Sequence, residues 1–454
     1  AREDPLRALV EANINAVLAL VLCLAADALG PIVLWVGAWP DGTGIVLVAD
    51  RLSALMVLVS SVVTALVVIF PSRRDIADGA DGAPVSVFHP TFLVLTAGVS
   101  NAFLAGDLFN LFVGFETLLF ASYVLIMLGA TKERVRAGST YVVVSVVSST
   151  LFLLTISIVY GATGTVSFAQ LPERLAALDP GLQLVIQLLL LVVFGIKAAV
   201  FPLQAWLPDS YPTAPASVTA VFAGLLTKVG VFAIIRVQTL LFPESPLTDL
   251  LLVAAILTML LGILGALAQG EIKRLLSFTL VSHIGYMLLG VALGTAAGLS
   301  GAIFYIVHHI LVQTALFIVV GLIERVGGST SLARLGGLAS VPLLAVLYLV
   351  PALNLGGIPP FSGFLGKVAL IDGALETGSP LAMLAVVAGV AIVTAGATAV
   401  TMTAMVPPED RKEVVVPMFA GFVSVTHASM RPLSFVAGEM LLDDGDMGRE
   451  LLLN

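Results

Sequence analysis

The chain has 454 residues, of which 59% are hydrophobic and only 11% are charged, and its mean hydropathy is +1.09. A soluble domain carries roughly a quarter charged residues, so this composition excludes a soluble protein. Runs of about 20 apolar residues recur along the whole chain, and each is long enough to cross a bilayer as a helix. The sequence lacks the short alternating segments of a membrane barrel, so it predicts an all-α, polytopic membrane protein.

Charge and cysteine content narrow the class further. The net charge is −8, with acids clustered in loops and near the C-terminus, which argues against a nucleic-acid partner. Cys23, the one cysteine, excludes an intrachain disulfide and a cysteine metal site. Residues 1–5 include no Met and show no signal-peptide pattern, so we expect a truncated start.

Apolar runs between charged, proline or glycine breaks predict about thirteen spans. In chain order they are 9–29, 50–70, 89–105, 107–129, 137–160, 182–201, 216–240, 248–269, 275–294, 298–323, 341–370, 380–405 and a weaker one at 414–430.

Two of these spans are interrupted by proline. The sixth runs into Phe201-Pro202 and a Pro-rich stretch that ends at Pro215, and the eleventh contains Gly357-Ile358-Pro359-Pro360. Proline removes a helix hydrogen bond and clashes with the preceding turn, so we expect both helices to be broken. Non-helical backbone at that depth survives only inside protein or beside water.

Basic residues concentrate in the loops after every second span. They are Arg73 and Arg74; Lys132, Arg134 and Arg136; Lys273 and Arg274; Arg325 and Arg334; and Arg411 and Lys412. The opposite loops hold little beyond Arg174, so the positive-inside rule places the first set in the cytoplasm. We interpret Lys132, Lys273 and Lys412 as solvated topogenic residues.

Three lysines lie inside apolar spans instead: Lys197, Lys228 and Lys367. Lysine loses its proton when desolvated, whereas arginine stays charged, so lysine suits a group that must change charge. Lys228 lies roughly 18 Å into its helix at 1.5 Å per residue, too deep for easy snorkelling. Lys197 and Lys367 flank the predicted helix breaks. Snorkelling is the alternative role for the three lysines, and capping of the freed carbonyls is a further alternative for Lys367.

One acid and three histidines complete the buried titratable set. Glu116 follows Asp107 closely enough to lie roughly 14 Å into its helix, where it needs a partner, and a buried lysine is the natural one. His283, His308 and His309 titrate near neutrality and are candidates for relaying protons, although buried histidines are often simply hydrogen-bonded. No histidine or acid spacing suggests a metal, and no Gly-rich phosphate loop or Ser–His–Asp arrangement suggests a cofactor or hydrolase site.

Several motifs resemble the antiporter-like membrane subunits shared by respiratory complex I and the Mrp multisubunit cation/proton antiporters. The carrying segments are 107–116 (DLFNLFVGFE), 195–209 (GIKAAVFPLQAWLPD), 271–278 (EIKRLLSF), 283–286 (HIGY) and 357–364 (GIPPFSGF). Lys367 and the tract from Tyr305 to Arg325 are similar to the Mrp D subunit, although the N-type subunit of complex I shares that lysine.

The resemblance implies fourteen helices in two inverted five-helix repeats, each with one broken helix. It divides the chain into N-terminal helices (1–88), a first repeat (89–240), a second repeat (248–405) and a C-terminal helix and tail (406–454). It also implies roles: Glu116 and Lys197 as a coupled pair, Lys228 as central relay, His309 as a link and Lys367 as distal gate. Three departures are the absent first helix, the segment 414–430, which is shorter and more broken than the family's last helix, and Gln313, which stands where many relatives have lysine.

We therefore expect a D-type, proton-translocating subunit of a multisubunit Na⁺(cation)/H⁺ antiporter in a prokaryotic plasma membrane, with other subunits and the lipid bilayer as partners and no cofactor. The alternative is a proton-pumping subunit of complex I or of a membrane hydrogenase, an enzyme whose redox chemistry lies in other chains. A membrane-embedded lipid-modifying enzyme is a further alternative, but it would need an acidic metal cluster or nucleophile that the sequence does not show.

Overall fold

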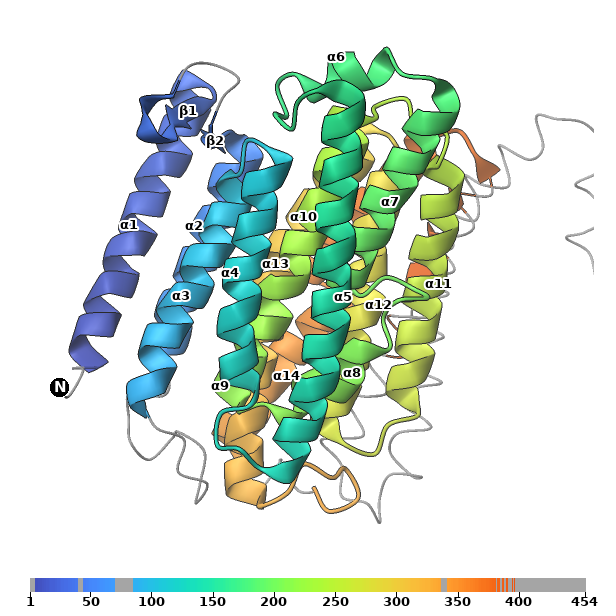
Figure 1. The fold of residues 1–454 in the computed structure, drawn as a ribbon. Helices are drawn as coiled ribbons and strands as arrows, with labels where there is room; N and C mark the ends of the chain where they lie inside the picture. The colour runs from blue at the N-terminus through green and yellow to red at the C-terminus, as the bar shows by residue number, and fades with distance from the viewer. Residues whose placement is uncertain are drawn as a thin grey trace, which may run out of the picture.

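The computed structural model describes residues 5–39, 44–69, 85–335 and 341–380, with single positions as far as residue 396. Within them, ten helices are long and apolar enough to cross a membrane, so the all-α polytopic class is confirmed. The helices run side by side as one bundle (Figure 1). The predicted span 380–405 lies mostly, and the span 414–430 wholly, outside the described residues.

The N-terminal region is an antiparallel helix pair joined by a small hairpin. Helix α1 (Pro5–Leu29) packs along α2 (Arg51–Ile69), and strands β1 (Ile32–Trp35) and β2 (Val46–Ala49) lie between them in the sequence. A 3-10 turn, η1 (Val36–Ala38), follows β1. Sequence reasoning missed the hairpin because four-residue apolar strands leave too short a pattern to separate from helix.

A first set of helices follows, in the order expected. It comprises α3 (Val85–Leu104), α4 (Leu108–Ile126), α5 (Lys132–Thr163), the short α6 (Leu171–Ala176), α7 (Pro180–Ala198), α8 (Trp206–Ser210), η2 (Tyr211–Thr213), α9 (Ala216–Val221), η3 (Phe222–Leu226), α10 (Thr227–Arg236) and η4 (Val237–Leu241). The segment from α9 to η4 is one continuous span, but η3 and η4 are π-helical turns within it, which the sequence did not predict.

The second set repeats this plan. It comprises α11 (Thr248–Leu267), α12 (Ile272–Ala292), α13 (Ala296–Gly327), α14 (Pro342–Gly356) and α15 (Ser362–Glu376). In each set the first two helices pack closely at a glycine: a side chain at Gly98 in α3 would meet the backbone of Leu118, and one at Gly262 in α11 would meet the backbone of Ser282. Small residues allow such close backbone approach between membrane helices.

Backbone bridges show that the two sets are inverted repeats. Asp107 before α4 bridges Ser167 after α5, and Glu271 before α12 bridges Ser331 after α13, with the same spacing along the chain. The first bridge lies near the hairpin, because Ala105 bridges Leu47 of β2. The second lies at the opposite end, where α12 begins beside α8. The repeats therefore point in opposite directions across the bundle.

Both predicted helix breaks are confirmed. Helix α7 ends at Ala199, whose left-handed φ of 58° stops the helix before Pro202, and α8 begins at Trp206. Helix α14 ends at Gly357, whose φ of 76° stops the helix before Pro359 and Pro360, and α15 begins at Ser362. Both breaks place non-helical backbone inside the bundle next to a lysine, which is Lys197 at the first break and Lys367 at the second.

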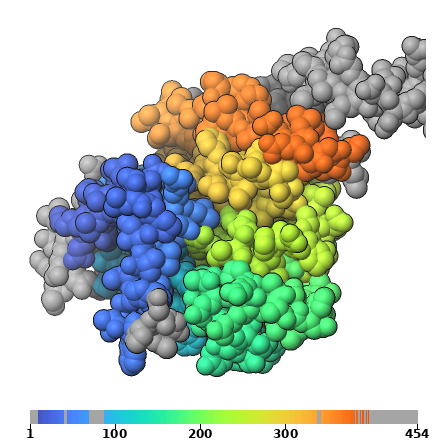
Figure 2. Space-filling view, turned by 90° about the horizontal axis from the view of Figure 1, so that it is seen from above, coloured from blue at the N-terminus to red at the C-terminus, as the bar shows by residue number. Residues whose placement is uncertain are grey.

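Burial is concentrated on two helices that carry titratable residues. Over an 18-residue window of each span, all of α9–η4 and 94% of α12 are buried, whereas only 17% of the α1 window is buried. Viewed along the bundle, the green first repeat and the yellow-to-orange second repeat occupy neighbouring sectors, with the blue N-terminal helices at one edge (Figure 2). Lys228 and His283 thus lie at the protein interior rather than against lipid.

Candidate proton-translocation site

Lys197 is the buried cation of the first repeat. It lies on the last turn of α7, just before the break, and its Nζ donates a hydrogen bond to Ser149 Oγ of α5 at 3.2 Å. The same ammonium lies 4.7 Å from the centre of the Phe115 ring. A hydroxyl and an aromatic face stabilise the ammonium less than a carboxylate would. Lys197 is therefore positioned by two weak interactions rather than by an ion pair.

Glu116 does not form the direct ion pair with a lysine that we expected. Within the part of the chain that the structure describes, no lysine or arginine nitrogen lies within 4 Å of its carboxylate. Its Oε1 atom is buried and has no hydrogen-bond partner among the described residues. The two charges still interact through space, because Glu116 directly follows Phe115, whose ring lies beneath the Lys197 ammonium. Glu116 and Lys197 therefore interact electrostatically without forming an ion pair.

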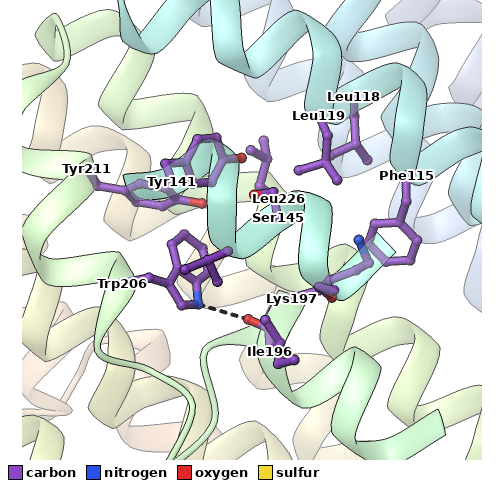
Figure 3. A pocket seen from close by; sticks show the side chains of 12 residues that line it. Phe115, Leu118, Leu119, Tyr141, Ser145, Ile196, Lys197, Trp206, Tyr211 and Leu226 are labelled. Atoms are coloured by element: carbon purple, nitrogen blue, oxygen red, sulfur yellow. Dashed lines mark hydrogen bonds between the residues drawn. The ribbon is translucent and has the colours of Figure 1, made fainter. Parts of the chain in front are cut away.

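A small cavity opens beside Lys197 (Figure 3). Its volume of about 20 Å³ is enough for roughly one water molecule. Tyr141 and Tyr211 lie on one side, Lys197 on the other, and Trp206 closes the floor by donating its indole N–H to the carbonyl of Ile196 at 3.0 Å. The cavity therefore connects the helix break with the lysine and with polar hydroxyls from α5 and η2.

Lys228 lies at the centre of the bundle and is fully buried. Its Nζ donates to the carbonyl of Ala223 at 2.6 Å, and Ala223 belongs to the π-helical turn η3. A π-turn shifts the backbone bonding pattern and leaves a carbonyl for a side chain to use, and such turns are frequent at functional sites. The buried Thr227 hydroxyl beside it has no hydrogen-bond partner among the described atoms. The sequence located Lys228 but not the turn that binds it.

The three predicted histidines form one cluster with two tyrosines. The rings of His283 and His309 are 5.2 Å apart, and Tyr305 donates or accepts a 2.6 Å hydrogen bond with His283 Nδ1. The ring of Tyr305 also lies 5.3 Å from that of His308, tilted by 52°, and the ring of Tyr286 lies 5.6 Å from that of His283. Lys228 interacts electrostatically with both His309 and His283, so the cluster begins where the first repeat ends.

His308 and His309 are adjacent in sequence but face different groups, as the helix geometry predicted. His309 points toward His283, whereas His308 Nδ1 bonds to Ser362 Oγ at 3.0 Å. Ser362 in turn donates to Asn354 Oδ1 at 3.2 Å, across the second helix break. His308 therefore connects the histidine cluster to the non-helical backbone between α14 and α15.

Lys367 lies on α15 after the break and is nearly fully buried. Its Nζ donates to the carbonyl of Gly356 at 2.6 Å and to Thr394 Oγ1 at 2.8 Å, and it lies 5.3 Å from the centre of the Tyr286 ring. The capping role that we considered for Lys367 is therefore present in the structure. Because Tyr286 also contacts His283, the same lysine is connected to the histidine cluster.

Lys273 corrects an expectation from the sequence. We interpreted it as a solvated residue of a basic loop, but it lies in the first turn of α12, is buried and pairs with Glu324 of α13 at 2.6 Å. Its neighbour Arg274 pairs with Asp209 of α8 at 2.8 Å. Because Asp209 and Arg274 belong to different repeats, this end of α12 connects the two repeats.

Two further polar groups bear on the predicted path. Gln313 is fully buried; its Nε2 donates to the carbonyl of Leu276 at 3.0 Å, while its Oε1 has no partner among the described atoms. At the hairpin end, outside the spanning helices, burial raises the pKa of Asp107 despite hydrogen bonds from backbone N–H groups of Asn110, Val46 and Phe109. Asp107 is the N-cap residue of α4, the second helix of the first repeat.

Sequence reasoning missed the groups that hold the buried cations and histidines. Among the described residues they are Ser149 on Lys197, the Ala223 carbonyl on Lys228, Tyr305 on His283 and Ser362 on His308. Tyr305 gave a signal as the first residue of the tract that is similar to the Mrp D subunit, and Ser362 gave one as part of the motif at 357–364. No group of three or more histidine, cysteine, aspartate or glutamate side chains that could hold a metal occurs in the described ranges.

Comparisons with known proteins identify the family of this chain. Residues 105–393 match the family described as NADH:quinone oxidoreductase/Mrp antiporter, TM. The D subunit of the Na⁺/H⁺ antiporter from Alkalihalophilus pseudofirmus is 44% identical over 346 residues, covering 75% of this chain and 69% of that protein. The protein of the same name from Bacillus subtilis is 40% identical over the same shares.

Solved structures give the same result. A chain of the Mrp complex from Dietzia superposes with a TM-score of 0.81 and 36% identity, covering 88% of this chain and 74% of that one. A chain of an archaeal membrane-bound sulfane sulfur reductase gives 0.80 and 27%, covering 94% and 89%. A chain of respiratory complex I from Thermus thermophilus gives 0.76 and 27%, covering 87% and 83%.

Proposed function

Because this chain belongs to the NADH:quinone oxidoreductase/Mrp antiporter family, we propose that it is the D-type, proton-translocating subunit of a multisubunit Na⁺/H⁺ antiporter in a prokaryotic plasma membrane. Relatives at 44% and 40% identity are named as the D subunits of Na⁺/H⁺ antiporters. Its partners are then the other subunits of that complex and the surrounding bilayer, and its transported ions are protons together with Na⁺ or another monovalent cation.

The observation that supports the proposal is the line of titratable groups across both repeats, all of them buried except the half-buried Glu116. It begins at Glu116 and Lys197, continues through Lys228 to the cluster of His309, His283 and His308, and ends at Lys367. Ionisable residues inside a membrane are costly and mark ion pathways. Each lysine in this line also has a backbone or hydroxyl oxygen that holds it near its neighbours.

In this mechanism a proton moves along the line by changing the charge of one group at a time. A proton arriving at Glu116 or Lys197 alters the field at the next lysine, because opposite charges favour and like charges disfavour each other's charged forms. The histidines carry the proton from Lys228 toward the second break, and Lys367 releases it. Inward proton movement then drives cation export elsewhere in the assembly.

A second candidate is a proton-pumping subunit of a redox complex. Chains of the sulfane sulfur reductase and of complex I superpose nearly as well as the Mrp chain, with TM-scores of 0.80 and 0.76 against 0.81. The sequence identities favour the antiporter, at 36% against 27% for both redox complexes. In either assembly this chain would carry protons and no redox chemistry of its own.

Purification of the native complex separates the two candidates. We expect the copurifying subunits to lack flavin and iron–sulfur clusters, and we expect the reconstituted complex to dissipate a preformed pH gradient when Na⁺ is added. An absorbance spectrum with flavin or iron–sulfur bands, and a pH gradient that responds to an electron donor and not to Na⁺, would support the redox complex instead.

A further inference from the structure

Tyr305 carries a hydroxyl into the most enclosed part of the second repeat. Its side chain is fully buried, and its ring packs between His283, at 5.8 Å, and His308, at 5.3 Å. Burying a hydroxyl costs free energy unless it is hydrogen-bonded, and packing alone would be served by phenylalanine. The hydrogen bond that the Tyr305 hydroxyl makes therefore offsets the cost of burying it.

That bond goes to one nitrogen of one histidine. Tyr305 Oη lies 2.6 Å from His283 Nδ1, and the two rings are nearly parallel, with 11° between their planes. The other ring nitrogen of His283, Nε2, is buried and has no protein partner among the described atoms, and the same is true of both nitrogens of His309, whose ring is 5.2 Å away. One nitrogen of His283 is thus occupied by Tyr305, and the other is left for chemistry.

A histidine held at one nitrogen keeps a defined orientation and tautomer. The hydrogen bond at Nδ1 opposes rotation of the imidazole about its Cβ–Cγ bond, and a hydroxyl that donates to Nδ1 places the ring proton on Nε2. Partners of this kind fix the reacting nitrogen of histidines elsewhere in proteins and affect activity without touching the substrate. Here the fixed nitrogen belongs to the group between Lys228 and the second helix break.

We propose that Tyr305 is a positioning residue for proton transfer, holding His283 through Nδ1 so that Nε2 serves the exchange with His309. The proposal rests on the proton path proposed above and adds a residue to it. Tyr305 does not carry the proton; it keeps the imidazole in register each time the proton passes. Its effect should therefore vanish when His283 is absent.

Tyr348 offers a matched control in the same repeat. It is also a fully buried tyrosine, on α14, but it is not part of the histidine cluster or of the proposed path. Replacing either tyrosine by phenylalanine keeps the ring and removes one oxygen. The two substitutions therefore differ in whether His283 loses its hydrogen bond.

The test is Na⁺-driven proton movement in proteoliposomes containing the whole complex, measured across a range of pH. We expect Tyr305→Phe to reduce the rate about tenfold and to change the pH profile, while Tyr348→Phe keeps both close to those of the wild type. His283→Gln should keep only a residual rate, and the double variant Tyr305→Phe/His283→Gln should keep the same residual rate, because the tyrosine acts through the histidine.

Several results would overturn the proposal. They are a wild-type rate and pH profile for Tyr305→Phe, an equal loss for Tyr348→Phe, a normal rate for His283→Gln, or a loss in the double variant beyond that of His283→Gln. If Tyr305→Phe does not assemble on a native gel, difluorotyrosine at position 305 keeps the ring and changes only the strength of the donor. The pH profile must then shift, and an unchanged profile sinks the role. Absence of exchange in the wild-type complex would instead refute the proposed function.

Discussion

The two repeats share a scaffold but solvate their lysines differently. In the first repeat Lys197 lies before the helix break and contacts a hydroxyl at 3.2 Å and an aromatic ring. In the second repeat Lys367 lies after the break and donates to a backbone carbonyl at 2.6 Å as well as to a hydroxyl. The second lysine is bound by the shorter bond and by more oxygen atoms.

The partners of the two lysines also differ in their hydrogen-bonding chemistry. A serine hydroxyl both donates and accepts, so Ser149 remains bonded whether Lys197 is charged or neutral. A carbonyl only accepts, and its bond to an amine is strongest when the amine is charged. In the proposed mechanism the Ser149 hydroxyl serves both charge states of Lys197, whereas the Gly356 carbonyl favours the charged form of Lys367.

The largest expected effect concerns the acid and lysine of the first repeat. Glu116→Gln and Lys197→Ala should each lower Na⁺-driven proton movement about 100-fold or more, because a group on the proton path cannot be replaced by one that does not titrate. The complex should still assemble on a native gel. Glu133→Gln, an exposed acid in the first turn of α5, is the control and should transport normally. Normal transport by either path variant would make the pair structural and remove the contrast between repeats.

A smaller but still severe effect is expected at Lys367. Lys367→Arg keeps the charge and the donors at the Gly356 carbonyl but cannot release its proton, so transport in vesicles should fall at least about tenfold. Lys132→Arg, at an exposed position, controls for the substitution itself. Because a side chain at Gly357 would lie 2.7 Å from Lys367 Cδ, the site is tight, and assembly must be checked on a native gel. Wild-type transport by an intact Lys367→Arg complex would leave Lys367 with only its capping role.

The smallest effect should come from Ser149. Ser149→Ala removes the hydroxyl that accepts from Lys197 but leaves the Phe115 ring, so we expect a loss of about fivefold, in line with about 1 kcal/mol for a single hydrogen bond. Ser139→Ala on the same helix, where the hydroxyl bonds to its own helix at Val135, should have no effect. A loss at Ser149 as large as at Lys197 would show that the hydroxyl carries the proton itself.

The spans and both breaks were predictable because composition and proline act locally. Runs of apolar residues mark the helices, and Pro202 and Pro359 forbid a continuous hydrogen-bond ladder wherever they fall. Lys197, Lys228 and Lys367 were recognisable as unusual because a charge in such a run is costly regardless of its neighbours. These features require knowledge of a single segment only.

Contacts between distant segments were not predictable. The π-turn that holds Lys228 leaves no mark in composition, because it results from a shift of backbone bonds under packing from α13. Lys273 has the neighbours of a loop residue but meets Glu324 because α12 and α13 pack together. Glu116 was expected to meet a lysine directly, but the rotation of α4 places Phe115, not the carboxylate, against Lys197.

In the proposed mechanism Lys228 joins the two repeats into one proton path, and a neutral analogue of this lysine tests that role most directly. Lys228→Met has nearly the same volume and keeps the apolar contacts of a fully buried side chain while removing the titratable amine. Na⁺-driven proton movement should be measured in proteoliposomes with the whole complex, after assembly has been verified on a native gel. We expect an intact Lys228→Met complex to exchange no protons for Na⁺. Exchange at the wild-type rate would contradict a path through Lys228.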